Sequence, residues 1–295
     1  MQTLIIDNLS KRYGTIRALN NVSLAVDNGE VFGYLGPNGA GKTTTLRIIL
    51  GLVHATSGGV QLLDRTPSVA AIRENVGYLP GELRLYGNMT GKALLDHFAG
   101  FRPHRPPLLR NHLVDVLAIG SSVLHQRIKF LSHGTRQKLG LVIAMQHDPT
   151  LVLLDEPTTG LDPLVQKSFK EVVKDFARRG NSVFFSSHVL SEVEDVCSRV
   201  AILRSGEIVA IESIENLRSR MVRRLQVRFR DFVPNDLLDT SGVTDSEISG
   251  KEVWLTIRGD VNPILRRLAR ADIENFVFPE PELEDIFLKY YQSTT

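Results

Sequence analysis

The chain has 295 residues, of which 42% are hydrophobic and 23% charged, a composition typical of a globular protein and not of a disordered chain or a fibrous repeat. Its length predicts about two domains, and its 35 basic and 33 acidic side chains leave a formal charge of +2, which argues against nucleic acid or anionic lipid as a partner. The single cysteine, Cys197, cannot form an intramolecular disulfide, so we expect a reducing compartment.

No segment predicts a membrane span. The longest stretch without Asp, Glu, Lys or Arg covers residues 48–63 and contains several polar residues, whereas a spanning helix needs about 18 or more apolar residues. The first residues also lack the basic and then apolar pattern of a secretory signal. We therefore expect any membrane role to depend on another chain.

The N-terminal part of the chain predicts strands at residues 3–6, 22–26 and 31–35. Apolar residues alternate over 22–26, while 31–35 is the continuous apolar run of a strand buried on both faces. This last run leads into a glycine-rich segment and then into a helical pattern over residues 42–50. A strand, a glycine-rich turn and a helix in this order indicate an α/β unit.

The middle of the chain predicts a helical insertion followed by more sheet. Residues 92–146 are mainly helical in pattern, interrupted by three prolines at 103, 106 and 107. The short apolar runs at 151–154 and 183–186 suit inner parallel strands. Together these patterns predict an α/β sheet with a helical insertion near the middle.

The remaining residues, 222–295, predict a separate small α+β domain. Apolar residues alternate near 225–229 and 253–257, and amphipathic helices are expected at 262–271 and 283–291 around a strand at 275–278. Six arginines lie between residues 218 and 230. These arginines could bind nucleic acid or lipid head groups. Because few aromatic residues lie between them and the chain is nearly neutral, a solvent-exposed strand face and a linker are favoured instead.

The glycine-rich segment has the pattern of a phosphate-binding loop, G-x-x-x-x-G-K-[ST]. Its glycines allow a tight turn that points backbone N–H groups at an anion, and the following helix adds its positive N-terminal end. Lys42 would contact the β- and γ-phosphates, and the Thr43 hydroxyl would bind Mg2+. The alternative is a plain glycine-rich turn, which the position between a strand and a helix disfavours. The candidate nucleotide-binding residues here are Gly36, Pro37, Asn38, Gly39, Ala40, Gly41, Lys42, Thr43 and Thr44.

A second candidate group is the acidic pair after the strand at 151–154. Asp155 would hold the water shell of Mg2+ at the edge of the sheet. Glu156, on the other face of the strand end, would polarise an attacking water. Two acidic residues after four aliphatic ones are a common pattern. They indicate a nucleotide-binding site only because a phosphate-binding loop precedes them in the chain.

Residues 131–138, LSHGTRQK, resemble the LSGGQ signature of ATP-binding-cassette (ABC) proteins. Three further features occur in that family's order: Tyr13 resembles its adenine-stacking aromatic, Asp162 closes a segment similar to its D-loop, and His188 resembles its switch histidine. The resemblance covers residues 1–215 and implies a P-loop NTPase cassette with a mixed sheet and a helical subdomain at about 83–150. It also implies that the chain binds ATP and Mg2+ and hydrolyses ATP.

In this family two cassettes sandwich two ATP molecules, so the resemblance implies a second ATP-binding subunit, which we expect to be a copy of the chain. Ser132 and Gly134 would contact the γ-phosphate held by the opposite subunit, and His188 would contact the γ-phosphate in its own site. Taken alone, Ser132 is an ordinary helix N-cap, His188 a common hydrogen-bonded histidine, and Tyr13 a residue that packs after a short strand.

The sequence departs from the family pattern at two positions. His133 replaces a signature glycine, which other cassettes tolerate. After Pro80 the family commonly has Gln, which contacts Mg2+ and the attacking water, whereas this chain has Gly81 and then Glu82. Glu82 either reaches into the site in place of that Gln or is a solvated loop residue.

The sequences of residues 77–83 and 283–288 are similar to those of the corresponding segments in ATPases of type-2 ABC exporters. The resemblance therefore implies the ATP-hydrolysing subunit of an exporter, held at the cytoplasmic face of the membrane by a separate membrane-spanning permease. Three alternatives remain open at this point: a soluble ABC-type ATPase, an importer ATPase, and a regulator without activity. The intact Lys42, Asp155, Glu156 and His188 argue against the last of these.

Overall fold

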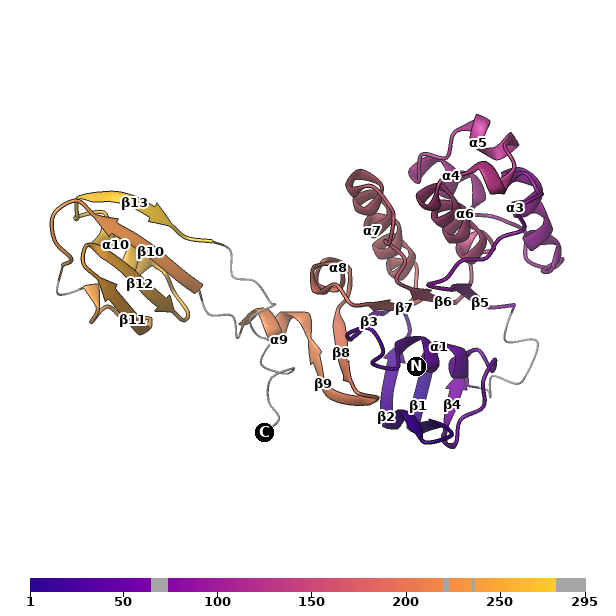
Figure 1. Ribbon diagram of the computed structural model, residues 1–295, viewed down its shortest axis with the longest axis horizontal. Coiled ribbons are helices and arrows are strands. Elements are labelled where there is room, and N and C mark those ends of the chain that lie inside the picture. The colour runs from indigo at the N-terminus through magenta and orange to yellow at the C-terminus, as the bar shows by residue number, and fades with distance from the viewer. Residues whose placement is uncertain (65–73, 220–222, 235–236, 280–295) are drawn as a thin grey trace. The chain divides into compact units, whose positions relative to one another are not determined.

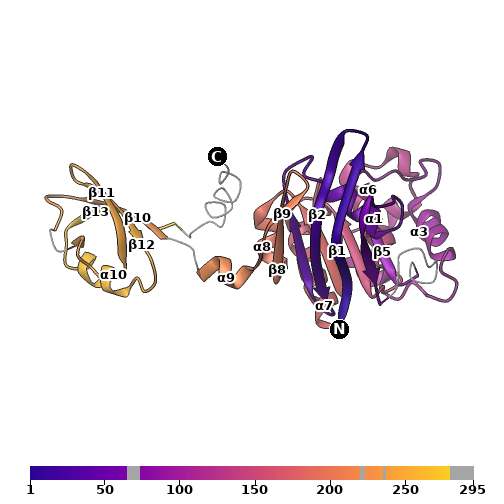
Figure 2. The same ribbon diagram turned by 90° about the horizontal axis from the view of Figure 1, so that it is seen from below.

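The computed structural model describes residues 1–64, 74–219, 223–234 and 237–279. The chain divides into two compact units, Met1–Ile214 and Glu215–Thr295 (Figures 1 and 2). Within the described residues, no helix combines the length and the apolar character needed to cross a bilayer.

The first unit begins with an antiparallel sheet in the order β2-β1-β4. It consists of β1 (Gln2–Tyr13), β2 (Ile16–Asp27) and β4 (Ser57–Leu62). The predicted strands at 3–6 and 22–26 are therefore only parts of a long hairpin, which pairs as far as Tyr13 and Ile16. The half of the hairpin near its turn is rich in polar residues, which gave no strand signal in the sequence. Gly58 and Gly59 weakened the strand signal of β4 in the same way.

The second sheet has the strand order β5-β6-β7-β3-β8-β9. It is formed by β3 (Val31–Leu35), β5 (Val76–Leu79), β6 (Leu151–Asp155), β7 (Ser182–Ser187), β8 (Arg199–Arg204) and β9 (Glu207–Ser213). All neighbouring strands are parallel except β8 and β9. This confirms the mixed sheet and the three predicted inner strands. The register places Leu35 beside Ser187 and Asp155 beside Ser186, so three strands end together at one edge.

Helices cover the parallel sheet on both faces. Helix α1 (Lys42–Ile49) contacts β2 and β4 of the first sheet and β6 of the second, so it lies between the two sheets. Helices α7 (Pro163–Arg178) and α8 (Leu190–Val196) pack against β3 and β7. The buried core between the sheets includes Phe32, Tyr34 and Phe184, and their burial holds the three strand ends in fixed positions.

The helical insertion is present but is not one continuous pattern. Its elements are α3 (Gly91–Gly100), α4 (Arg110–Val116), α5 (Ser121–His125), a 3-10 turn (Ile128–Phe130) and α6 (His133–Met145). The proline-rich segment at 103–107 separates α3 from α4, as expected for residues that lack a backbone donor. Figure 1 shows α3, α4, α5 and α6 gathered in one group within the first unit.

The second unit is an antiparallel sheet in the order β11-β12-β10-β13. Its strands are β10 (Arg223–Phe229), β11 (Val243–Ser249), β12 (Glu252–Ile257) and β13 (Ile273–Val277). Helix α10 (Asn262–Leu268) adds Ile264 and Leu268 to a core with Leu225, Val227 and Leu255. Helix α9 (Ile214–Ser219) lies where the two units divide. The helix expected at 283–291 lies outside the described residues.

Candidate functional site

The phosphate-loop candidate connects β3 to α1 and is held by its own backbone. Gly36 donates its N–H to the carbonyl of Ser187 at 3.2 Å, and Pro37 accepts the N–H of Ala40 at 3.1 Å. Gly41 has a φ of +110°, and a Cβ there would stand 2.7 Å from the Ala18 carbonyl oxygen. Only glycine fits this position without strain, so the loop conformation follows from its sequence.

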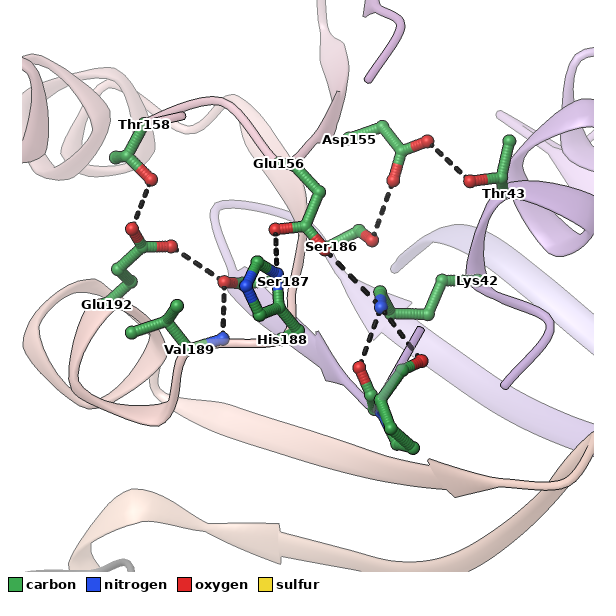
Figure 3. Close-up of polar contacts among 12 residues, drawn as sticks. Lys42, Thr43, Asp155, Glu156, Thr158, Ser186, Ser187, His188, Val189 and Glu192 are labelled. Atoms are coloured by element: carbon green, nitrogen blue, oxygen red, sulfur yellow. Dashed lines mark hydrogen bonds and ion pairs between the residues drawn. The ribbon is translucent and has the colours of Figure 1, made fainter. Parts of the chain in front are cut away.

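Lys42 is buried and directs its ammonium group into the loop (Figure 3). Its Nζ donates to the carbonyl oxygens of Gly36 at 2.7 Å and Pro37 at 3.3 Å, and it lies 3.3 Å from Oε1 of Glu156. The cation is thus held by partners that an anionic group can replace, since a phosphate oxygen is a stronger acceptor for an ammonium than a neutral carbonyl.

The two carboxylates of the acidic pair have different partners. Asp155 accepts hydrogen bonds from the hydroxyl of Thr43 at 2.8 Å and from that of Ser186 at 3.0 Å. Glu156 has a left-handed φ of +51°, which turns its side chain towards Lys42 and His188. Its Oε2 lies 2.7 Å from Nδ1 of His188 (Figure 3). The sequence prediction had grouped these residues, and the structure brings them together.

A cavity of about 620 Å³ opens beside these groups. Its lining comprises Ile16, Arg17, Ala18, Asn38, Gly39, Gly41, Lys42, Thr43, Thr44, Arg47, Tyr78, Pro80, Gly81, Glu82, Asp155, Glu156 and Thr159. The loop glycines, Lys42 and the start of α1 suit a polyphosphate. The Thr43 hydroxyl and the Asp155 carboxylate, 2.8 Å apart, are oxygen ligands of the kind that Mg2+ takes together with phosphate oxygens and waters.

Gly81 keeps this oxygen pair open. A Cβ at Gly81 would already lie 3.3 Å from Oδ2 of Asp155, so a longer side chain there would project over the carboxylate. Within the described residues, no cluster of three or more His, Cys, Asp or Glu side chains could hold a metal alone. The Thr43 hydroxyl and the Asp155 carboxylate fit a Mg2+ ion that takes its other ligands from phosphate and water.

Glu82 lies at the rim of the cavity. Its side chain is 89% exposed, and its carboxylate lies 3.6 Å from the guanidinium of Arg84. Among the described residues, it contacts neither Asp155 nor the phosphate loop through a hydrogen bond or an ion pair.

Tyr13 does not line the cavity. It ends β1 with a ring that is 45% exposed, and the ammonium of Lys11 lies 4.8 Å from its centre. The hairpin reaches the cavity instead through Ile16, Arg17 and Ala18 at the start of β2. The ring is thus on the neighbouring strand of the same hairpin.

Ser132, Gly134 and Asp162 also lie outside the cavity lining. Ser132 is the N-cap of α6 and accepts the N–H of Thr135 at 3.2 Å, while Asp162 caps α7 by accepting the N–H of Val165 at 3.0 Å. A Cβ on Gly134 would come within 2.3 Å of the Gly160 carbonyl oxygen. The first turn of α6 therefore packs tightly against the segment between the acidic pair and α7.

The cavity also contains residues that the sequence reasoning missed. Burial and the nearby charge of Asp155, partly offset by Arg47, raise the pKa of Tyr78 to about 12, so its hydroxyl stays protonated even in moderately alkaline solution. Arg47 could have been found, because it follows Thr43 by four residues and shares its helix face. Tyr78 gave no local signal, and neither did the buried Gln137, which lies outside the cavity lining and donates to the carbonyl of Pro157 at 3.2 Å.

Comparisons with known proteins place the chain among ATP-binding cassettes. A family model described as ABC transporter matches residues 19–159. The uncharacterized ABC transporter ATP-binding protein YdbJ of Bacillus subtilis (strain 168) is 34% identical over 97% of this chain and 94% of its own length. The bacitracin transport ATP-binding protein BcrA of Bacillus licheniformis is 32% identical over 78% of this chain and 76% of its own. A solved ATP-binding subunit of an ABC transporter is 28% identical, with a TM-score of 0.66 over 73% of this chain and 92% of that one.

Proposed function

The chain belongs to the ATP-binding proteins of ABC transporters and is an ABC-type ATPase, and on that premise we propose that two copies of it hydrolyse ATP with Mg2+ to drive a membrane exporter. The observation that carries this proposal is the connected set of Lys42 and Glu156, which line the cavity, and His188, which contacts Glu156 from outside the lining. These residues join a phosphate-binding cation, a carboxylate and an imidazole in one line of contacts.

The phosphate loop binds the triphosphate. Its backbone N–H groups and the N-terminus of α1 point at the phosphate oxygens, and Lys42 exchanges its carbonyl partners for the β- and γ-phosphates. Thr43 and Asp155 would hold Mg2+, which when bound neutralises charge on the phosphates. Positioning and charge neutralisation of this kind supply most of the catalysis in phosphoryl transfer.

Glu156 positions the attacking water. Its carboxylate accepts a hydrogen bond from the water and increases the electron density on the water oxygen. His188, 2.7 Å away, orients that carboxylate and contacts the γ-phosphate. When ATP draws Lys42 away from Glu156, the carboxylate keeps His188 as its partner and becomes available for the water.

A second copy of the chain completes each site in our proposal. Ser132 is exposed at the start of α6, and neither it nor Gly134 lines the cavity of its own chain. A hydroxyl and free N–H groups at a helix N-terminus favour a phosphate from a partner. ATP bound between two chains would stabilise the closed pair by its higher affinity for that state. In this proposal the Tyr13 ring and Glu82 move onto the nucleotide as the pair closes.

We assign the docking of the membrane-spanning permease to an aromatic cluster in the helical insertion. The rings of Tyr86, His97, Phe98 and Phe101 contact one another, with centroids 4.9–6.4 Å apart. Tyr86 is 58% and Phe101 63% exposed, and exposed apolar groups of this size are common at interaction sites. Residues 81–90 connect the cavity rim to this cluster, so nucleotide binding has a short route to it.

Export, as opposed to import, rests on the similarity of residues 77–83 and 283–288 to ATPases of type-2 ABC exporters. The relative BcrA, whose name describes bacitracin transport, supports a transport role without giving its direction. The two-domain division of the chain, with a cassette at 1–215 and an accessory domain at 222–295, belongs to the same proposal. Location at the cytoplasmic face of the membrane follows from binding to the permease. Recovery with ribosomes or DNA and no membrane chain would favour the soluble alternative.

The test of the catalytic assignment is Glu156→Gln. We expect this variant to lose nearly all ATP hydrolysis, to keep ATP binding, and to form a closed pair of chains with ATP. Glu171→Gln is the matched control, because it changes an exposed glutamate on α7 that pairs with Lys174 at 3.1 Å. Phosphate release and equilibrium ATP binding measure the two effects. Undiminished hydrolysis by Glu156→Gln would overturn the assignment.

The test of the docking surface is Phe101→Ser. We expect the purified variant to hydrolyse ATP normally but to be absent from detergent-solubilised membranes of cells that express the transporter. Phe232→Ser is the control, because Phe232 is 77% exposed on the second unit. Membrane recovery of Phe101→Ser equal to that of the parent would contradict this surface.

A further inference from the structure

A hydrogen-bonded brace lies beside the catalytic residues and includes Glu192 of α8. The carboxylate of Glu192 accepts the hydroxyl of Thr158 on one oxygen and the hydroxyl of Ser187, at 2.7 Å, on the other. The Ser187 oxygen in turn accepts the N–H of Val189 at 2.9 Å. Figure 3 shows this chain of contacts on the side of His188 opposite to Lys42.

The two hydroxyls belong to the segments that carry the proposed catalytic pair. Thr158 follows Glu156 by two residues, and Ser187 directly precedes His188. Thr158 is 1% and Ser187 0% exposed, so water offers these side chains no equivalent partner. A single carboxylate therefore ties the backbone near Glu156 to the backbone near His188.

These bonds have the strength to hold a geometry. Hydrogen bonds to an ionised carboxylate are about twice as strong as neutral ones. The left-handed φ of Glu156 is a conformation that a non-glycine residue keeps only where its surroundings hold it. The brace supplies such a constraint at Thr158, two residues after Glu156.

We propose that Glu192 is a positioning residue for ATP hydrolysis, which fixes the Nδ1 of His188 against the Glu156 carboxylate without touching the nucleotide. The inference rests on the roles proposed for Glu156 and His188. It goes beyond them because it makes a residue of α8, away from the cavity lining, necessary for the catalytic geometry.

The experiment compares Glu192→Ala and Glu192→Gln with Asp195→Ala. Asp195 is on the same helix and its carboxylate pairs with Lys170 at 2.6 Å, so the control removes a carboxylate from α8 without touching the brace. Since small misplacements in an active site can cost on the order of 100-fold, we expect Glu192→Ala to lower kcat at least about tenfold. The KM for ATP should change by less than about threefold, because Lys42 and the phosphate loop, which bind most of the triphosphate, are untouched.

A second measurement separates positioning of His188 from a purely structural role of Glu192. It is the 15N chemical shift of His188 Nδ1 in the chain without nucleotide, which a purely structural role would leave unchanged. It should change in Glu192→Ala, change less in Glu192→Gln, whose amide oxygen still accepts one hydroxyl, and stay constant in Asp195→Ala. If Glu192→Ala is poorly folded, the Glu192→Gln variant carries the same comparison. A parental kcat in Glu192→Ala, or a fall in kcat with an unmoved His188 signal, would overturn the inference.

Glu156→Gln in the same assay separates this inference from the proposed function. If Glu156→Gln is inactive while Glu192→Ala and Glu192→Gln match the parent, only the role of Glu192 is wrong. If Glu156→Gln hydrolyses ATP at the parental rate, the proposed catalytic site itself is wrong.

Discussion

At the scale of single residues, the roles proposed for the neighbours Asp155 and Glu156 differ because their surroundings differ. Both oxygens of Asp155 are already engaged by hydroxyls, which suits a fixed ligand. Glu156 instead contacts Lys42 and His188, two groups that can exchange partners when phosphate arrives. The two proposed roles therefore follow from the hydrogen bonds around each carboxylate.

His147, outside the site, gives a test of buried charge. It is 3% exposed, and burial, with the Arg102 charge nearby, lowers its pKa from 6.5 to about 3. Between these values the unfolded chain binds a proton that the folded chain does not, so the free energy of unfolding falls as pH decreases. The slope from one such group is at most about 1.4 kcal/mol per pH unit.

We therefore expect the free energy of unfolding to fall less steeply from about pH 6 to about pH 4 in His147→Leu than in the parent. This pH window lies between the pKa values of His147 in the unfolded and the folded chain. Urea unfolding at several pH values measures the slope. His112→Leu, which changes an exposed histidine of α4, should keep the parental slope. An identical pH dependence in His147→Leu and the parent would contradict the argument.

The sequence could predict the site residues that follow one another along the chain within a single motif. The segment from Gly36 to Thr43 forms one loop, and Asp155 and Glu156 follow one strand, so local sequence contained the information. The contact of Glu192 with Thr158 joins residues 34 positions apart, and no local pattern encodes such a distance. Tyr78 was missed for the same reason, because its environment comes from Asp155 and Arg47.

At the scale of elements, the first turn of α6 packs tightly against the segment that follows the acidic pair. Gly134 lies against Gly160, Gln137 donates to Pro157 at 3.2 Å, and Lys138 lies 3.8 Å from Asp162. The residues proposed to bind a partner's phosphate are thereby fixed to those proposed to act in the chain's own site. The sequence predicted helix here, but the close approach depends on two glycines 26 positions apart in the numbering, which no helical pattern indicates.

Gly134→Ala tests this packing. Its Cβ would stand 2.3 Å from the Gly160 carbonyl oxygen, and overpacking of this kind costs about 1–3 kcal/mol. We expect a lower melting temperature and weaker ATP hydrolysis. Gly100→Ala is the control, because a Cβ at the end of α3 meets nothing within 4 Å. Equal melting temperatures for the two variants would show that the contact is not tight.

At the scale of the whole molecule, each unit has its own buried core, and the order of strands within each sheet was beyond the sequence. The sequence predicted the inner strands because they are continuous apolar runs, yet β3 pairs with β7, whose residues lie about 150 positions later, as in Val31 and Val183. Such parallel pairing depends on packing of the helices between the strands and not on any local motif.

The proposed pairing of two chains predicts that two defective variants restore each other. Lys42→Ala damages the phosphate loop, while Ser132→Asp keeps a good N-cap but places a negative charge where the partner's γ-phosphate would bind. In a mixed pair, the intact loop of one chain faces the intact α6 of the other. We expect each variant alone to be nearly inactive and an equimolar mixture to recover roughly a quarter of parental hydrolysis, from one working site in half of the pairs.

The control for this complementation is a mixture of Lys42→Ala with Glu156→Gln. Both changes damage the half-site formed by the chain's own phosphate loop, so every mixed pair has two broken sites and no recovery is expected. Phosphate release after exchange of subunits measures both mixtures. If the Lys42→Ala and Ser132→Asp mixture shows only the sum of its components, the γ-phosphate is not shared between two chains, and Ser132 serves α6 as an N-cap alone.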